Sequence, residues 1–97
     1  MSAKAYIFIN TEEGKTCQVV KMLRGNADVE SVEVLEGYPD IIVAMKARTR
    51  QKLTKSVIQA LTTIENLTND TQVLPVKKAY TSRQFDKPAQ RIERAAN

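Results

Sequence analysis

A turn that runs directly into an apolar strand occupies residues 37–45, Gly37-Tyr38-Pro39-Asp40-Ile41-Ile42-Val43-Ala44-Met45. Gly, Pro and Asp are common turn residues, so residues 37–40 are predicted to reverse the chain. Residues 41–45 are all apolar and start with β-branched side chains, which indicates a strand. The preceding residues 29–36 also have a strand-like pattern. Two strands joined by a short turn predict an antiparallel hairpin.

Upstream of this hairpin, the sequence predicts one strand and one helix. Residues 5–9 are a short run of β-formers and are expected to form the first strand. Residues 14–24 have apolar side chains at helical spacing, and Gly25 follows as a stop signal. In the strand at 29–36, alternation places two of the four apolar side chains on each face. We expect Val32 and Val34 on one face, and Val29 and Leu35 on the other.

Downstream of the hairpin, a second helix is expected to begin at Thr49 or Arg50. Its apolar side chains recur at helical spacing and predict one buried stripe. The stripe consists of Leu53, Val57, Ala60, Leu61 and Ile64. Residues 66–70 are expected to close this helix, and residues 71–76 to form the last strand.

The predicted order is strand, helix, strand, strand, helix, strand. Right-handed crossovers then give an α+β fold, the ferredoxin-like βαββαβ, in which a four-stranded antiparallel sheet carries both helices on one face. The length of 97 residues fits one domain, expected over residues 1–77, followed by a basic tail at 78–97.

Composition excludes several kinds of site. Cys17 is the single cysteine and histidine is absent, so neither an intrachain disulfide nor a zinc site within one chain can form. A histidine general base is excluded as well. No cofactor is expected. Without an apolar run of 18 residues or a signal peptide pattern, we expect a soluble, cytoplasmic protein.

The net charge of +4 is concentrated in the tail. Residues 1–76 hold nine basic and nine acidic residues, whereas residues 77–97 hold six basic and two acidic ones. A neutral body with a basic tail differs from a basic nucleic-acid-binding face, so direct DNA binding is not expected. Arg50, Lys52 and Lys55 near the start of the second helix oppose the helix dipole, which suggests another role for them.

The strands at 5–9 and 41–45 are apolar at odd and even positions alike. An antiparallel sheet with one wet face should alternate. The helix-free face is therefore expected to expose apolar side chains and to form a dimer by packing sheet on sheet. The predicted interface is Tyr6, Phe8, Ile42 and Ala44; the opposite phase would expose Ile7, Ile9, Ile41 and Val43. Alternatively, the C-terminal tail covers this face.

Two groups of residues are candidate ligand sites. In the turn, Gly37 permits close backbone approach, Tyr38 offers a ring face and Asp40 can pair with an ammonium group. An ordinary hairpin turn would use the same residues. The acidic residues around the second strand could bind a hard cation, or a copper or zinc ion if combined across subunits. Alternatively, they form a solvated edge that faces basic residues 48–55. They are Asp28, Glu30, Glu33 and Glu36.

Residues 5–76 resemble the C-terminal effector domain of the Lrp/AsnC transcription regulators, also called the RAM domain. The likeness rests on residues 5–10, 14–23, 29–35, 37–43, 53–64 and 73–76. It implies homodimers formed by sheet packing, often assembled into tetramers or octamers. It also implies a small effector, commonly an amino acid, bound between dimers near the turn.

The resemblance also implies which residues bind the effector. Gly37 and Asp40 match the turn of the family directly, whereas Tyr38 stands one position early and is followed by Pro39. The family often holds its effector with residues of the fourth strand, where the candidates are Asp70, Thr71 and Gln72.

Full-length members carry a helix-turn-helix domain, for which there is no room before Ala5. The chain therefore resembles a stand-alone effector domain that acts in transcription regulation through oligomerisation or co-assembly with a DNA-binding regulator. The alternative is a metal-binding or metal-sensing variant of the same fold. We do not expect an enzyme, because small enzymes of this fold typically use His, Trp or an Arg-bearing loop, and residues 11–14 are acidic.

Overall fold

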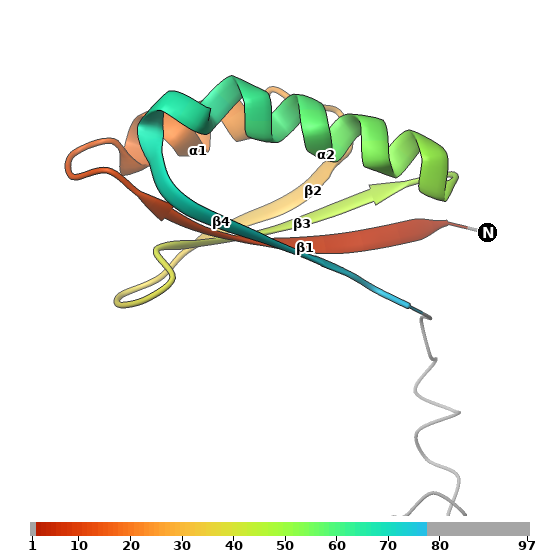
Figure 1. The fold of residues 1–97 in the computed structure, drawn as a ribbon, viewed down its shortest axis with the longest axis horizontal. Coiled ribbons are helices and arrows are strands. Elements are labelled where there is room, and N and C mark those ends of the chain that lie inside the picture. Colours follow the sequence, from red (N-terminus) through yellow and green to blue (C-terminus); the bar gives the residue numbers. More distant parts are fainter. Residues whose placement is uncertain (1, 78–97) are drawn as a thin grey trace, which may run out of the picture.

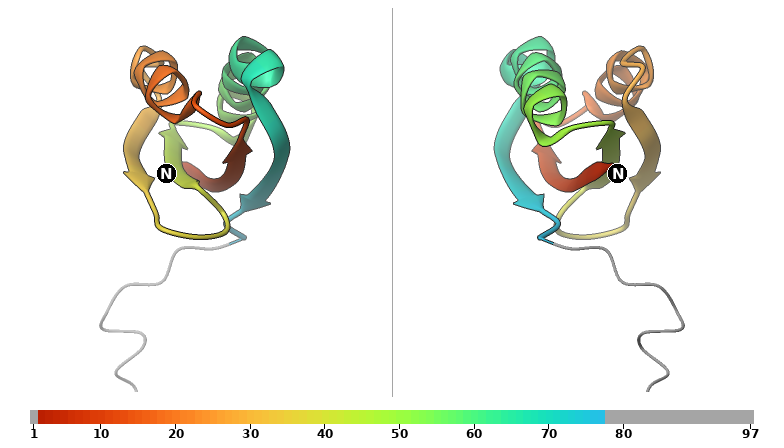
Figure 2. Two further views of the ribbon diagram at one scale, coloured as in Figure 1. Left: turned by 90° about the vertical axis from the view of Figure 1, so that its left-hand side faces the viewer. Right: turned by 90° about the vertical axis from the view of Figure 1, so that its right-hand side faces the viewer.

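A computed structural model describes residues 2–77, which form one layer of sheet and one layer of helices (Figure 1). The elements are β1 (Ala3–Thr11), α1 (Thr16–Arg24), β2 (Val29–Val34), β3 (Ile41–Ala47), α2 (Arg50–Ile64), the 3₁₀ turn η1 (Glu65–Leu67) and β4 (Thr68–Pro75). The strands are antiparallel in the order β2-β3-β1-β4. Both helices cover the same face (Figure 2). The predicted ferredoxin-like fold is confirmed, and the predicted tail at 78–97 lies outside the described residues.

The core lies between the sheet and the two helices. Alternate residues of the central strands face it, including Ile7 and Ile9 of β1 and Val43 of β3, which are fully buried. Helix α1 contributes Val19 and Leu23. Burying an aliphatic side chain of this size stabilises a fold by roughly 1.5–3 kcal/mol. The predicted stripe of α2 is confirmed, with Leu53, Val57, Ala60 and Ile64 buried and Leu61 packed beside them.

Helix α2 begins where the sequence predicted. Thr49 has an extended backbone, and its Oγ1 accepts a hydrogen bond from the backbone N–H of Lys52 at 3.1 Å. This bond satisfies one of the donors that a helix N-terminus leaves unpaired. The first residue of the helix is therefore Arg50, one of the two predicted starts.

The prediction for the end of α2 was wrong. The α-helix ends at Ile64, and Glu65–Leu67 form a 3₁₀ turn. Strand β4 then begins at Thr68, three residues before the predicted start, because Thr68 already pairs with Thr11. A β-bulge near Asn10 accommodates this early pairing.

The predicted faces of β2 were also wrong in part. Val29 pairs with Met45 and Val32 pairs with Val43, so both valines face the core, although they are three residues apart. The reason is a register shift between Val29 and Ser31, where a bulge adds one residue to the strand. Leu35 lies beyond the end of β2 and is exposed.

The helix-free face has the predicted composition. Tyr6 lies opposite Ala44 on one side and Leu74 on the other. Phe8 lies opposite Ile42 in the same way. Because Ile7, Ile9, Ile41 and Val43 are buried under the helices, the first of the two predicted phases is the observed one. Within residues 2–77, no helix is long and apolar enough to cross a membrane.

Candidate functional site

The β2–β3 turn is tied firmly to the end of β1. The N–H of Asp40 donates to the carbonyl of Ile9 at 3.0 Å, and the N–H of Leu35 donates to the carbonyl of Asp40 at 2.7 Å. The side chain of Asp40 adds two further bonds, because its Oδ2 accepts from the N–H of Thr11 at 2.9 Å and from the hydroxyl of Thr11 at 3.2 Å. Asp40 thus anchors the turn on the sheet.

Thr11 is a residue of this site that sequence reasoning missed. It is the one polar residue among the buried side chains of residues 2–77, and its hydroxyl lies 2.9 Å from that of Thr16 at the start of α1. The sequence signal that could have identified Thr11 is its hydroxyl group at the end of an otherwise apolar strand. Thr11 already donates two hydrogen bonds to one carboxylate oxygen of Asp40. A ligand ammonium group that pairs with Asp40, as predicted, would compete with these bonds.

The turn leaves the sheet on the side opposite the helices (Figure 1). Gly37 has φ of +119°, a conformation that residues with a Cβ rarely adopt, as its place in the turn suggested. Tyr38 follows, joined to Pro39 by a cis peptide bond, and is 81% exposed. Its hydroxyl lies 3.4 Å from Oδ2 of Asp70 in β4. The structure therefore brings together the two segments that the sequence analysis singled out separately.

The three predicted residues of β4 do not share one face. Thr71 pairs with the buried Ile9 and so lies on the helix-covered face. Asp70 and Gln72 point to the other face, where they lie opposite Asn10 and Phe8. Asn10 was not predicted; its Oδ1 accepts from the N–H of Asp40 at 3.3 Å. We define the turn site as residues 37–40 together with Asn10, Asp70 and Gln72.

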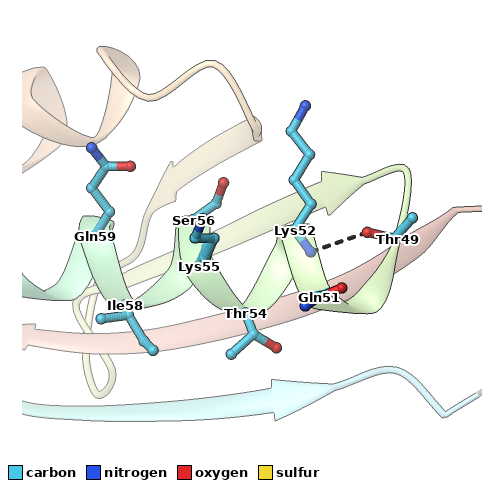
Figure 3. Close-up of a pocket in the computed structure, with 8 residues that line it drawn as sticks. All are labelled: Thr49, Gln51, Lys52, Thr54, Lys55, Ser56, Ile58 and Gln59. Carbon is cyan, nitrogen blue, oxygen red and sulfur yellow. Dashed lines mark hydrogen bonds between the residues drawn. The ribbon is translucent and has the colours of Figure 1, made fainter.

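Apart from the turn site, a hollow lies on the outer surface of α2 (Figure 3). The side chains around it all come from this helix and its N-cap residue, and none is a predicted site residue. They are Thr49, Gln51, Lys52, Thr54, Lys55, Ser56, Ile58 and Gln59. Since no other element walls this surface, it does not enclose a small molecule in the way ligand pockets do.

The predicted acidic group is spread along β2. Asp28 accepts a hydrogen bond from the hydroxyl of Ser56, and Glu30 forms an ion pair with Lys4 at 3.4 Å. Tyr6 and then Glu30 raise the pKa of Lys4 above its usual range. Glu36 lies beyond the other end of the strand. Among residues 2–77 of the single chain, no three His, Cys, Asp or Glu side chains are grouped closely enough to hold a metal ion.

No family model matches the sequence, and no curated protein matches it. Solved structures do match. AsnC of E. coli superposes with a TM-score of 0.68 at 18% identity, over 79% of this chain and 52% of AsnC. The chain has the fold of the Lrp/AsnC effector domain. The resemblance predicted from sequence is thus confirmed at the level of fold.

Two further solved structures superpose on this chain. TTHA0845 from Thermus thermophilus has a TM-score of 0.72 at 18% identity, over 81% of this chain and 98% of its own. The transcriptional regulator NMB0573 from Neisseria meningitidis, solved as a complex with L-Met, has a TM-score of 0.64 at 18% identity, over 81% of this chain and 52% of its own. The chain therefore spans about half the length of AsnC and NMB0573, and nearly all of TTHA0845.

Proposed function

We propose that this chain is an effector-binding module of transcription regulation, which binds a small molecule of the amino-acid class at the turn site. The observation that carries the proposal is the approach of Tyr38 to Asp70, because it unites the turn and β4 on one exposed surface. The fold is shared with a regulator that was solved with L-Met. The proposed role is binding rather than catalysis, in a soluble cytoplasmic protein.

The chemistry of the turn site suits an amino acid. The exposed carboxylate of Asp70 can accept hydrogen bonds from a ligand ammonium group, and charge-assisted bonds of this kind are the stronger ones. The exposed ring of Tyr38 can pack against a ligand side chain. Gly37 and Pro39 shape the turn, Asp40 anchors it, and Gln72 offers an amide nearby. Thr71 is left out because it faces the helices.

The helix-free face supports a homodimer formed by sheet packing. Tyr6 and Leu74 are 36% and 37% exposed in the single chain, and they adjoin Phe8 and Ile42. A contiguous apolar patch of this kind commonly marks an interaction site. At roughly 25 cal/mol per Å² of apolar surface, covering these side chains would favour association substantially. Tetramers or octamers would then assemble from such dimers.

The output of the module would pass through another protein. We propose co-assembly with a full-length DNA-binding regulator of the same effector-domain fold, whose sheet or oligomer contacts this chain would share. The proposal is supported by the fold that this chain shares with part of AsnC and of the transcriptional regulator NMB0573.

Isothermal titration of the full chain with each of the twenty amino acids tests the effector proposal. At least one should bind with measurable heat and raise the melting temperature. Asp70→Asn should weaken that binding about tenfold or more, equivalent to about 1.4 kcal/mol. Glu65→Gln, an exposed carboxylate in η1, is the matched control and should bind as the unaltered chain does. No heat and no thermal shift with any amino acid would overturn the proposal.

A further inference from the structure

The charges of residues 2–77 are sorted to the two ends of the sheet. At one end, β3 leads into α2; we call it the basic end, and its core is Lys46, Arg48, Arg50, Lys52 and Lys55. Lys4 at the start of β1, Lys21 and Arg24 in α1, and Lys77 after β4 join them. Nine of the ten Lys and Arg residues among residues 2–77 therefore lie toward this end, and the only acidic residues of that part of the chain beside them are Asp28 and Glu30.

The opposite end, where β1 leads into α1 and α2 into β4, is acidic. We call it the acidic end, and it carries Glu12, Glu13, Glu36, Asp40, Glu65 and Asp70. Glu33 near the end of β2 adds a seventh carboxylate, and Lys15 is the one basic residue there among residues 2–77. Nine positive against two negative charges give +7 at the basic end, and one against seven gives −6 at the acidic end.

Among residues 2–77, ion pairs within the chain do not neutralise these charges. The single ion pair among residues 2–77 joins Lys4 to Glu30, and both belong to the basic end. Nor does folding explain the basic residues of α2, because its first turn contains no acidic residue and cations there oppose the helix dipole. The sorting therefore points to a partner outside the subunit.

The two ends also differ in shape. The loop with Glu12 and Glu13 projects from the sheet between β1 and α1 (Figure 1) and is held by two backbone hydrogen bonds. In these bonds Glu12 donates to the carbonyl of Leu67 at 2.9 Å and accepts from the N–H of Lys15 at 3.0 Å. At the basic end, the charged residues that line a shallow hollow are Lys46, Arg48 and Lys52 together with Asp28 and Glu30, and Glu30 is already paired with Lys4.

We propose that the acidic end of one copy docks onto the basic end of the next, with the Glu12–Glu13 projection entering the hollow at Lys46, Arg48 and Lys52. A second copy satisfies both charged ends at once, whereas a polyanion would satisfy only the basic one. The contact is head-to-tail, so it repeats until a ring closes or a chain forms. It is separate from the apolar sheet face and does not depend on effector binding.

Ionic strength separates this contact from the sheet dimer. Exposed charges interact over about 30 Å at 0.01 M salt but only about 8 Å at physiological ionic strength. Head-to-tail assembly should therefore grow as salt is lowered, while an apolar sheet dimer should persist at high salt. Sedimentation velocity of the full chain across a salt series measures both.

Charge reversal provides the decisive test. Glu12→Lys with Glu13→Lys reverses the charge of the projection and lowers the acidic end from −6 to −2. Arg48→Glu with Lys52→Glu reverses two of the basic residues at the hollow and lowers the basic end from +7 to +3. Each double variant alone should lose the salt-sensitive assembly, and an equimolar mixture should regain it. A control that adds positive charge in the middle of α2, Ile58→Lys with Gln59→Lys, should assemble as the unaltered chain does.

Several outcomes would overturn the proposal. One is an assembly size that does not change with salt, and another is a mixture that fails to reassemble. Persistent assembly of the Arg48/Lys52 variant would instead assign the contact to the basic residues 77–97. The basic end would instead be assigned to nucleic acid by two results together. The unaltered chain would bind a DNA duplex but show no salt-sensitive self-assembly, and the Arg48/Lys52 variant would no longer bind the duplex. Failure of the sheet dimer is distinguishable, because it would appear as monomers at high salt.

Discussion

The backbone N–H of Thr11, the last residue of β1, donates a hydrogen bond to Oδ2 of Asp40 at 2.9 Å, across 29 positions of the chain. The hydroxyl of Thr11 reaches the same oxygen at 3.2 Å. This contact fixes the end of the β2–β3 turn against the central strand. It thereby determines where Tyr38, two residues earlier, meets Asp70 of β4.

Asp40→Ala removes both of these bonds and leaves the N–H of the buried Thr11 without its partner. We expect a loss of about 1–3 kcal/mol in the free energy of unfolding, the usual effect of an unsatisfied buried donor. Urea denaturation measures it. Glu36→Ala, an exposed residue of the same connection, is the control and should change stability by less than about 0.5 kcal/mol. Equal effects of the two substitutions would contradict the anchoring role of Asp40.

Gly37→Ala tests the backbone of the turn. At φ of +119° a Cβ is strained even though no neighbouring atom lies within 4 Å, so we expect a loss of about 1–3 kcal/mol. Gly25→Ala is the matched control, because Gly25 ends α1 with φ of −76° and a Cβ there would lie 3.4 Å from the carbonyl oxygen of Met22. Thermal unfolding should show a clearly larger drop for Gly37→Ala, and a reversed order would refute the strain argument.

Ile42→Asp places a charge in the middle of the helix-free face, opposite Phe8. If this face forms the dimer, the buried carboxylate should abolish dimers, because an unpaired charge is costly to remove from water. Light scattering coupled to size-exclusion chromatography measures the mass. Ile58→Asp changes an exposed isoleucine on α2 and should leave the dimer intact. A dimer that survives Ile42→Asp would exclude this face as the interface.

Thr49→Ala removes the side-chain cap of α2. The N–H of Lys52 then loses its acceptor, and we expect a destabilisation of about 1 kcal/mol. Thr54→Ala is the comparison, because its hydroxyl only bonds back to the carbonyl of Arg50 within the exposed helix, and it should have an effect within about 0.5 kcal/mol. Chemical denaturation of both variants decides whether the cap matters.

Much of the fold follows from local patterns that the sequence shows directly. The spacing of Leu53, Val57 and Ile64 requires a helix with one buried side, and the apolar runs around Ile7 and Val43 require strands. Once that order is known, few topologies remain, because crossover connections are right-handed. The apolar composition of both faces of β1 and β3 also revealed the exposed patch, although not which phase would form it.

Only the tertiary structure decided the register of the strands, because pairing depends on residues distant in the sequence. The bulge that turns Val29 toward the core and the early pairing of Thr68 with Thr11 leave no local signal. A shift of one residue moves a side chain to the other face. For that reason the sequence determined only that the turn and β4 supply candidate residues. The fold decided that Asp70 meets Tyr38 and that Thr71 faces the helices instead. It also decided that the charges gather at opposite ends of the sheet.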